Sequence, residues 1–233
     1  MKIVTDRARL EEIFNRGIVT EILPSREEFF ERLQSGDRLK IYLGADPTAG
    51  SLHLSHVKNY WFLEELRQLG HEVIILIGDF TAQIGDPTDN RAARPPLAAE
   101  QIKTNVKSWL EQLKLLLNFT DPDNSPRLVY NSEWLAALTL KDVLTLAANF
   151  TVQQMIERDM FERRWQSHEP IHLHEFLYPL MQGYDSVALG VDAELCGTDQ
   201  IFNALAGRTL LKRLKNKDKF VIALNLMANP KTG

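Results

Sequence analysis

Cysteine is nearly absent from this sequence of 233 residues, in which Cys196 stands alone. A single thiol excludes a disulfide within the chain and is typical of a reducing compartment. No apolar run is long enough to span a bilayer, and the N-terminal segment MKIVTDRARLEEIF lacks the apolar core of a secretory signal. We therefore expect a soluble cytoplasmic protein with no membrane partner.

An excess of basic charge is also missing. The formal net charge is −4, with 27 lysines and arginines against 31 aspartates and glutamates, which excludes a chain-wide basic field for nucleic acid but not a local patch. The phosphate-binding motif G-x-x-x-x-G-K-[ST] is absent as well. What is present, 44% hydrophobic and 25% charged residues, is typical of an ordinary globular protein.

Five short apolar runs, bounded by turn-forming or polar residues, predict buried strands. They lie at 39–45, 71–80, 127–131, 193–197 and 219–225. Segments with helical spacing lie at 6–17, 24–36, 51–70, 98–119 and 198–214. The order strand, long helix, strand is typical of the βαβ unit of a parallel sheet.

The stretch from about 132 to about 180 interrupts this alternation with mostly helical patterns, the longest of which covers 139–165. We expect it to be a helical insertion between two halves of the sheet. The sequence thus predicts an α/β fold with a doubly wound parallel sheet and a helical insertion. In such folds, ligands bind beyond the carboxyl ends of the strands.

The segment PTAGSLHLSH follows the first predicted strand and holds two histidines, His53 and His56. A helix that starts there would present unpaired N–H groups and a partial positive charge, which favour an anion such as phosphate. A metal is a weaker interpretation, because helical metal-binding pairs are usually four residues apart and need a third ligand. For a bare H-x-x-H pair, ordinary helix residues are the simplest explanation.

The segment YPLMQGYDSV places three polar residues on one side of a predicted helix. Tyr178, Gln182 and Asp185 fall within an arc of roughly 60° at helical spacing. The surrounding residues are mostly apolar, so the helix is expected to be largely buried. A polar face is often simply solvated, but a buried carboxylate needs a partner, and a ligand is one candidate.

Five stretches taken together resemble the catalytic domain of tyrosyl-tRNA synthetases, from about residue 10 onward. The histidine segment is similar to the HIGH signature of class I aminoacyl-tRNA synthetases, and the others are YLGADPT, GDFTAQIGDPT, YPLMQGYDSV and CGTDQ. The resemblance implies a Rossmann-like catalytic domain over 1–233. It also implies an enzyme that joins tyrosine to ATP as tyrosyl-adenylate and passes the tyrosyl group to tRNA.

The resemblance also implies a role for each matching residue. Tyr42 and Asp185 would hydrogen-bond the phenol hydroxyl of tyrosine, so that phenylalanine would leave them unpaired. The α-ammonium group would be held by Tyr178, Gln182 and Asp86, with Gln200 near the carboxylate. The implied catalytic residues are His53, His56, Thr48 and Arg94. The implied ATP-binding residues are Gly44, Asp46, Thr48, His53, Ser55, His56, Gly197 and Asp199.

Other implications concern partners and cofactors. Asn131 is a weaker candidate behind the tyrosine pocket. ATP would enter with Mg²⁺ as a substrate, and neither a protein-bound metal nor a tightly bound cofactor is expected. The helical insertion at about 132–180 resembles the dimer interface of the family, so we expect a homodimer.

Several positions depart from the family pattern. Ser55 replaces the glycine of HIGH, Asn90 replaces a lysine with Arg91 beside it, and Cys196 replaces a glycine and reads as a packing residue. The KMSKS loop, the anticodon-binding region and the C-terminal RNA-binding domain are expected after NPKTG and are absent from this sequence. We therefore expect a catalytic fragment with weak or no activity.

Two other functions are compatible with parts of the pattern. A small-molecule adenylyltransferase of the H-x-G-H group would explain the histidines but not the tyrosine-pocket residues. A synthetase-like paralogue that binds tyrosine or RNA without catalysis would be consistent with Ser55, Asn90 and the missing lysine loop.

Overall fold

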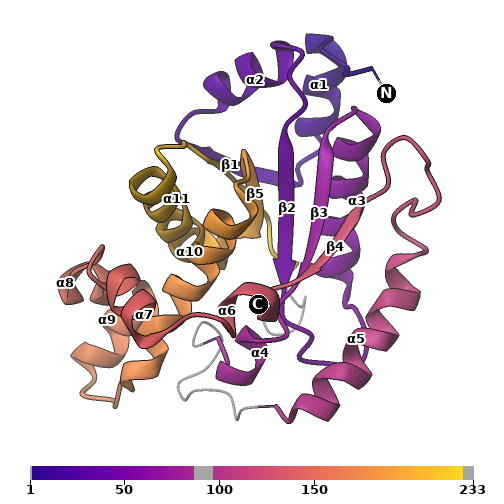
Figure 1. The fold of residues 1–233 in the computed structure, drawn as a ribbon. Coiled ribbons are helices and arrows are strands. Elements are labelled where there is room, and N and C mark those ends of the chain that lie inside the picture. The colour runs from indigo at the N-terminus through magenta and orange to yellow at the C-terminus, as the bar shows by residue number, and fades with distance from the viewer. Residues whose placement is uncertain (1, 87–96, 228–233) are drawn as a thin grey trace.

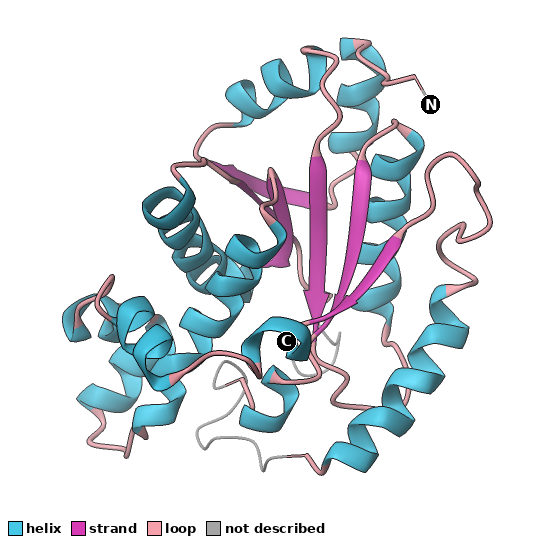
Figure 2. Cartoon of the chain, viewed as in Figure 1, coloured by secondary structure: helices cyan, strands magenta, loops and turns pink. Residues whose placement is uncertain are grey.

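A six-stranded sheet forms the centre of the computed structural model, which describes residues 2–86 and 97–227 (Figures 1 and 2). The strands are β1 (Val19–Leu23), β2 (Lys40–Ala45), β3 (Glu72–Ile77), β4 (Arg127–Tyr130), β5 (Ala193–Gly197) and β6 (Phe220–Leu224). Their order is β1-β6-β5-β2-β3-β4. Among these strands every neighbouring pair is parallel except β1 and β6, which confirms the predicted fold class.

Helices cover both faces of the sheet (Figure 1). They are α1 (Arg7–Phe14), α2 (Arg26–Gln34), α3 (Leu54–Gln68), α4 (Thr81–Ile84), α5 (Ala99–Leu113), α6 (Ser132–Leu135), α7 (Leu140–Ala147), α8 (Val152–Ile156), α9 (Asp159–Gln166), α10 (Tyr178–Leu189) and α11 (Ile201–Lys215). Two 3-10 helices, η2 (Leu173–Leu177) and η3 (Thr198–Gln200), precede α10 and α11. No helix in the described ranges is both long and apolar enough to cross a membrane.

The alternation of side chains along β2 decides which residue faces the site. Ile41 and Leu43 pack into the large core formed with α1, α2, α3 and α5. Tyr42, between them, points to the opposite face, where it packs with Ile74 and Leu76 near the end of α10. Successive side chains of any strand point to opposite faces of its sheet. The position of Tyr42 between Ile41 and Leu43 therefore places its hydroxyl on the α10 face.

The helical insertion is present, but its longest predicted helix is wrong. The segment 139–165 forms three short helices, α7, α8 and α9, which lie together at one end of α10 (Figure 1). Thr139 and Thr151 each make a capping box, in which a threonine side chain accepts from a backbone N–H three residues later. A capping box favours a helix start, so Thr151 begins a new helix where continuous spacing had predicted an unbroken one.

The antiparallel strand β1 was not predicted. Thr20 and Glu21 are exposed in the middle of this edge strand, and its register shifts between Val19 and Glu21. A strand with so few buried positions does not show the apolar alternation by which strands are identified.

Candidate functional site

A pocket of about 330 Å³ lies at the carboxyl ends of β2 and β5. It is lined by 14 of the predicted site residues: Tyr42, Gly44, Asp46, Thr48, His53, Ser55, His56, Asp86, Tyr178, Gln182, Asp185, Gly197, Asp199 and Gln200. Arg94 lies outside the described residues, as do Asn90 and Arg91. Segments far apart in the sequence thus meet in one hollow at the sheet edge where doubly wound folds bind ligands.

Tyr42 and Asp185 form a buried polar end of this pocket. The Tyr42 hydroxyl lies 3.0 Å from the Ser186 Oγ atom. Asp185 accepts from the Trp134 Nε1 atom at 2.7 Å and from the Asn131 Nδ2 atom at 3.5 Å. Burial raises the pKa of Asp185 well above its ordinary value, against the opposing effect of these two donors. Both oxygens thus face donors, which suits a group that accepts hydrogen bonds.

Asn131 acts as a bridge behind this end. Its side-chain oxygen accepts from the Phe80 backbone N–H at 3.0 Å, and its Nδ2 atom donates to the Thr81 Oγ1 atom at 3.0 Å as well as to Asp185. Asn131 is buried and follows β4, so it connects the end of that strand to α4 and α10. Asn131 thus lies beside Asp185, and its role behind the tyrosine pocket stays a prediction.

Asp46, directly after β2, is held by two hydroxyl groups. Tyr178 donates to its Oδ2 atom at 2.9 Å and Thr81 donates to its Oδ1 atom at 2.6 Å. Burial, and next the charge of Asp46, raise the pKa of Tyr178 well above its ordinary value, so the phenol remains a donor. Gly78 makes room for this arrangement, because a Cβ atom there would lie 1.9 Å from the Asp46 Oδ1 atom.

A chain of amide side chains connects the other carboxylates of the pocket. The Gln200 Nε2 atom donates to Asp86 at 2.7 Å, and Asn203 donates to the side-chain oxygens of both Gln200 and Gln182 at 2.9 Å. Asp86 also pairs with Arg158 at 3.3 Å. Asn203 and Arg158 were not predicted, because one lies within an ordinary helical pattern and the other comes from the insertion, with no local motif.

His53 and His56 lie at the start of α3, where His53 is the N-cap. Their rings stack with centroids 3.6 Å apart, and the His56 ring lies 5.1 Å from that of Trp109. Burial, and next the proximity of His53, lower the pKa of His56 to about 4, so it is neutral at pH 7. Within the described residues its buried Nδ1 atom has no hydrogen-bond partner.

The loop before α3 is held in place by α5. The Asn105 Nδ2 atom donates to the Pro47 carbonyl at 2.8 Å, and the Trp109 Nε1 atom donates to the Ala49 carbonyl at 2.7 Å. The Gln112 side chain accepts from the Leu52 N–H at 2.9 Å. These contacts leave the helix start open: among the described residues no side chain caps it. An uncapped helix start beside two imidazoles is suited to an anion.

Two of the positions that depart from the family pattern, Ser55 and Cys196, also line the pocket. Ser55, in the first turn of α3, accepts from the Met227 N–H at 3.4 Å through its hydroxyl. Cys196 is buried on β5, and burial raises the pKa of its thiol well above its ordinary value. A buried, protonated thiol is a packing group rather than a nucleophile.

Glu194, Ser186 and Lys219 form a buried polar cluster that the sequence patterns did not reveal. Glu194 belongs to a run that predicts only a buried strand, and Lys219 directly precedes β6. Gln182 donates to Glu194 at 3.1 Å, so the cluster is joined to the pocket. A polar residue in a buried strand can be noticed in the sequence, but its distant lysine partner cannot.

Known proteins provide a comparison for this geometry. The family described as tRNA synthetases class I (W and Y) matches residues 34–232. A tyrosine–tRNA ligase of Carboxydothermus hydrogenoformans is 47% identical over 228 residues, 96% of this chain and 54% of that protein. The tyrosine–tRNA ligase of Haemophilus influenzae is 46% identical over 208 residues, 89% of this chain and 51% of that protein.

Solved structures agree on the fold. A C-terminally truncated mitochondrial tyrosyl-tRNA synthetase of Coccidioides posadasii superposes with a TM-score of 0.80 at 25% identity, over 95% of this chain and 68% of that one. A tyrosyl-tRNA synthetase of Archaeoglobus fulgidus, solved with L-tyrosine, gives a TM-score of 0.76 at 23% identity. The chain spans about half the length of the curated relatives it matches.

Proposed function

The chain belongs to the class I tRNA synthetases of the tryptophan and tyrosine type, and from this premise we propose that it is the catalytic domain of a tyrosine–tRNA ligase. Its pocket would bind tyrosine and Mg-ATP and join them as tyrosyl-adenylate, with release of pyrophosphate. The observation that carries the proposal is the pair Tyr42 and Asp185, two buried polar groups in the same hollow as the two histidines.

The phenol end accounts for the choice of tyrosine. Asp185 would accept the hydrogen of the substrate hydroxyl, and Tyr42 would donate to its oxygen. Phenylalanine would offer no acceptor to the Tyr42 hydroxyl and no donor to Asp185, and a buried polar group that loses a hydrogen bond in this way costs about 1–3 kcal/mol. Tryptophan presents an N–H but no acceptor, so it would donate to Asp185 but offer nothing to the hydrogen of the Tyr42 hydroxyl.

The opposite end of the amino acid is an ammonium group, which needs acceptors. Tyr178, Gln182 and Asp86 line the pocket and each carries an oxygen that can accept, and Asp46 adds a second carboxylate. The hydrogen bonds that connect these groups hold them before the substrate arrives. Such preorganisation lowers the entropy cost of orienting the carboxylate for attack.

The histidines would serve the nucleotide. In the reaction a carboxylate oxygen of tyrosine attacks the α-phosphorus of ATP, and the bond to pyrophosphate breaks. Charge increases on the phosphate oxygens as this happens, and the helix start with His53 and His56 would donate hydrogen bonds to them. Thr48, Gly44, Gly197 and Asp199 would contact the rest of ATP. Arg94, in the segment outside the described residues, would add a cation.

Transfer to tRNA and assembly as a homodimer complete the proposal. The helical insertion has exposed apolar side chains at Leu140, Leu144 and Val152. Apolar side chains on neighbouring short helices are suited to being covered by a second copy of the chain.

Ligand binding tests the proposal directly. Tyrosine, phenylalanine and tryptophan are added in turn while Tm is followed, since a ligand of the native state raises it. We expect a shift with tyrosine alone, lost in Asp185→Asn and kept in Asp218→Asn, an exposed carboxylate used as control. A chain that responds to none of the three would refute the proposal.

A second measurement separates enzyme from paralogue. Tyrosine-dependent exchange between ATP and pyrophosphate is expected. Tyrosine binding with no exchange at any ATP concentration would favour the non-catalytic paralogue.

A further inference from the structure

Lys219 is a charged side chain in the interior of the protein, with 1% of its surface exposed. It directly precedes β6, and its ammonium group meets Glu194 of β5 and Ser186 of α10. Burying a charge is unfavourable unless it is paired and hydrogen-bonded. The ion pair with Glu194 explains how Lys219 is tolerated there, but not why a cation lies behind the phenol end of the pocket.

The surroundings of the ammonium group are adapted to it. The Lys219 Nζ atom lies 2.8 Å from the Ser186 Oγ atom and 5.8 Å from the centre of the Tyr42 ring. A Cβ atom on Gly207 of α11 would lie 2.7 Å from the Nζ atom and 2.8 Å from the Ser186 Oγ atom. The glycine therefore provides the space in which lysine and serine meet.

The direction of the hydrogen bonds follows from what each group can donate. An ammonium group donates and never accepts, so Ser186 accepts from Lys219 and its own hydrogen is free for another neighbour. The Tyr42 oxygen is 3.0 Å away and the nearer Glu194 oxygen is 3.5 Å away. Only the first distance lies in the usual range for two oxygens, so Ser186 donates to Tyr42.

Tyr42 then keeps its own hydrogen for another acceptor, and it has two directions in which to donate it: toward Glu194, which lies near enough to affect the phenol, or into the pocket. A phenol oxygen placed there accepts it, and the hydrogen of that phenol goes to Asp185. We propose that Lys219 is a positioning residue that sets the direction of this chain of hydrogen bonds, so that Tyr42 presents a donor, and not an acceptor, to the substrate hydroxyl. The inference rests on the proposed function, because it assigns a role at the tyrosine-binding end.

Glu194 connects Lys219 to the part of the pocket where the α-ammonium group of tyrosine would bind. It accepts from Lys219 and from the Gln182 Nε2 atom at 3.1 Å, which turns the Gln182 oxygen toward Asn203. Lys219 thus orients groups at both ends of the site without lining the pocket. Sequential hydrogen bonds of one direction strengthen one another, which favours the arrangement over its reverse.

Substitution of Lys219 by methionine tests the proposal. Affinities for tyrosine and phenylalanine are measured by calorimetric titration of the whole chain. In Lys219→Met we expect tyrosine to bind about tenfold more weakly, while phenylalanine changes less than about twofold. The matched control is Lys217→Met, because Lys217 donates to the Gly190 carbonyl and does not reach Ser186.

A second variant tests the same proposal if Lys219→Met fails to fold. Ser186→Ala removes the middle of the hydrogen-bond chain but keeps the pair of Lys219 and Glu194. We expect it to lower the ratio of tyrosine to phenylalanine affinity as Lys219→Met does, about tenfold, with a cooperative melting transition.

The outcomes are distinguishable. If Lys219 is only structural, the affinities for tyrosine and phenylalanine fall by the same factor, and the ratio of the two affinities is unchanged in either variant. That result overturns this inference but not the proposed function. A wild-type chain that binds no tyrosine overturns the proposed function and this inference with it. A ratio that falls in both variants but not in Lys217→Met supports both.

Discussion

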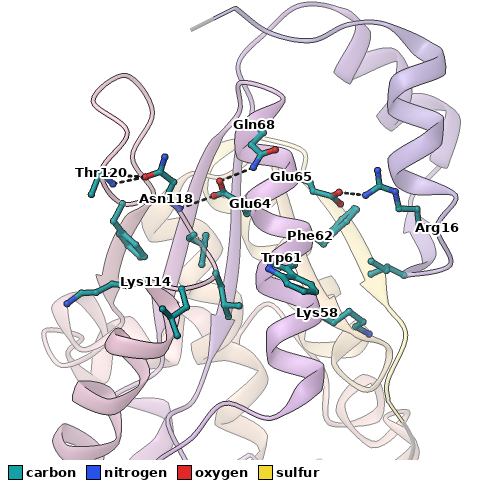
Figure 3. A pocket seen from close by; sticks show the side chains of 15 residues that line it. Arg16, Lys58, Trp61, Phe62, Glu64, Glu65, Gln68, Lys114, Asn118 and Thr120 are labelled. Carbon is teal, nitrogen blue, oxygen red and sulfur yellow. Dashed lines mark hydrogen bonds and ion pairs between the residues drawn. The ribbon is translucent and has the colours of Figure 1, made fainter.

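Two hollows lie along α3, and they differ in how their polar groups are satisfied. The pocket at the start of the helix measures about 330 Å³, whereas a groove along its later turns measures about 850 Å³ (Figure 3). In the groove, Glu65 pairs with Arg16, and Gln68 donates to Glu64 at 3.2 Å. Trp61 is 59% exposed and Leu115 is 84% exposed.

In the smaller pocket several polar groups are buried rather than exposed. Tyr42, Asp185 and Tyr178 are buried around it, and burial is the largest cause of the raised pKa of each. Burying such groups costs stability unless they are hydrogen-bonded, and clusters of groups with perturbed pKa values are typical of functional sites. The pocket thus differs from the groove in gathering three buried titratable groups whose pKa values are raised by burial, whereas the buried Glu64 of the groove is paired with Arg67.

The largest expected effect is that of Gly78→Ala. The new Cβ atom would displace Asp46, breaking its bonds to Tyr178 and Thr81. We expect tyrosine affinity to fall about a hundredfold, or ~2.7 kcal/mol, in calorimetric titration. Gly50→Ala is the control, since its Cβ atom would meet only Asn105 at 3.7 Å, and it should stay within about twofold. Equal losses in both would show that the pocket does not depend on Asp46.

Asp185→Asn should separate binding from stability. Burial raises the pKa of Asp185 above its ordinary value near 3.8, so the ionised form is disfavoured in the folded state. The stability of the wild type should therefore fall as pH rises from about 4 through the folded pKa, and the variant should not show this loss. We expect its Tm, relative to wild type, to increase with pH while tyrosine affinity drops at least about tenfold. A constant difference in Tm across pH would contradict the raised pKa.

His56 should make stability depend on pH in the opposite direction. Its pKa is lowered from 6.5 to about 4, so the unfolded chain takes up a proton first, and stability is lost as pH falls from 6.5 to about 4. After allowance for a partly exposed ring the loss is about 1 kcal/mol, or roughly 2–4 °C in Tm, and His56→Gln should remove it.

ATP should change this titration. Phosphate charge favours the imidazolium form, so the pKa of His56, followed by NMR, should rise when ATP binds. A pKa that stays the same with bound ATP would place the phosphates away from this ring.

The smallest effect is expected in the groove. Trp61→Ala removes an exposed ring that makes no polar contact with the pocket, so tyrosine and ATP binding should be unchanged and stability should shift by less than about 1 kcal/mol. Calorimetric titration and a melting curve would check both. A loss of ligand affinity in Trp61→Ala as large as that in Gly78→Ala would contradict the prediction that the groove does not contribute to ligand binding.

The sequence predicted most of what depends on local pattern. Each parallel strand was recognised from its apolar run, and Tyr42 and Asp185 were picked out by motifs that lie beside those strands. The three-helix form of 139–165 was missed because spacing alone does not show that Thr151 would cap a new helix.

What could not be predicted depends on contacts between distant segments. Arg158 reaches Asp86 from the insertion, and Lys219 reaches Ser186 from the far end of the chain. Neither contact follows from periodicity, because each is decided by how whole elements pack. Strand β1 also depends on a distant segment, because its one ladder in the described sheet is with β6.

That edge strand has a consequence for how the protein is made. In the order of the sheet, β6 lies between β1 and β5, and Asn225 after it donates to the Gly17 carbonyl across 208 positions of sequence. On a ribosome, the segment containing β1 is synthesised early but has no ladder partner until almost all of the described chain has emerged. Contacts so distant in sequence form late. Of the described strands, β6 is therefore the last to be synthesised and pairs with the first, and protection of the β1 amides from hydrogen exchange would mark the formation of this pairing.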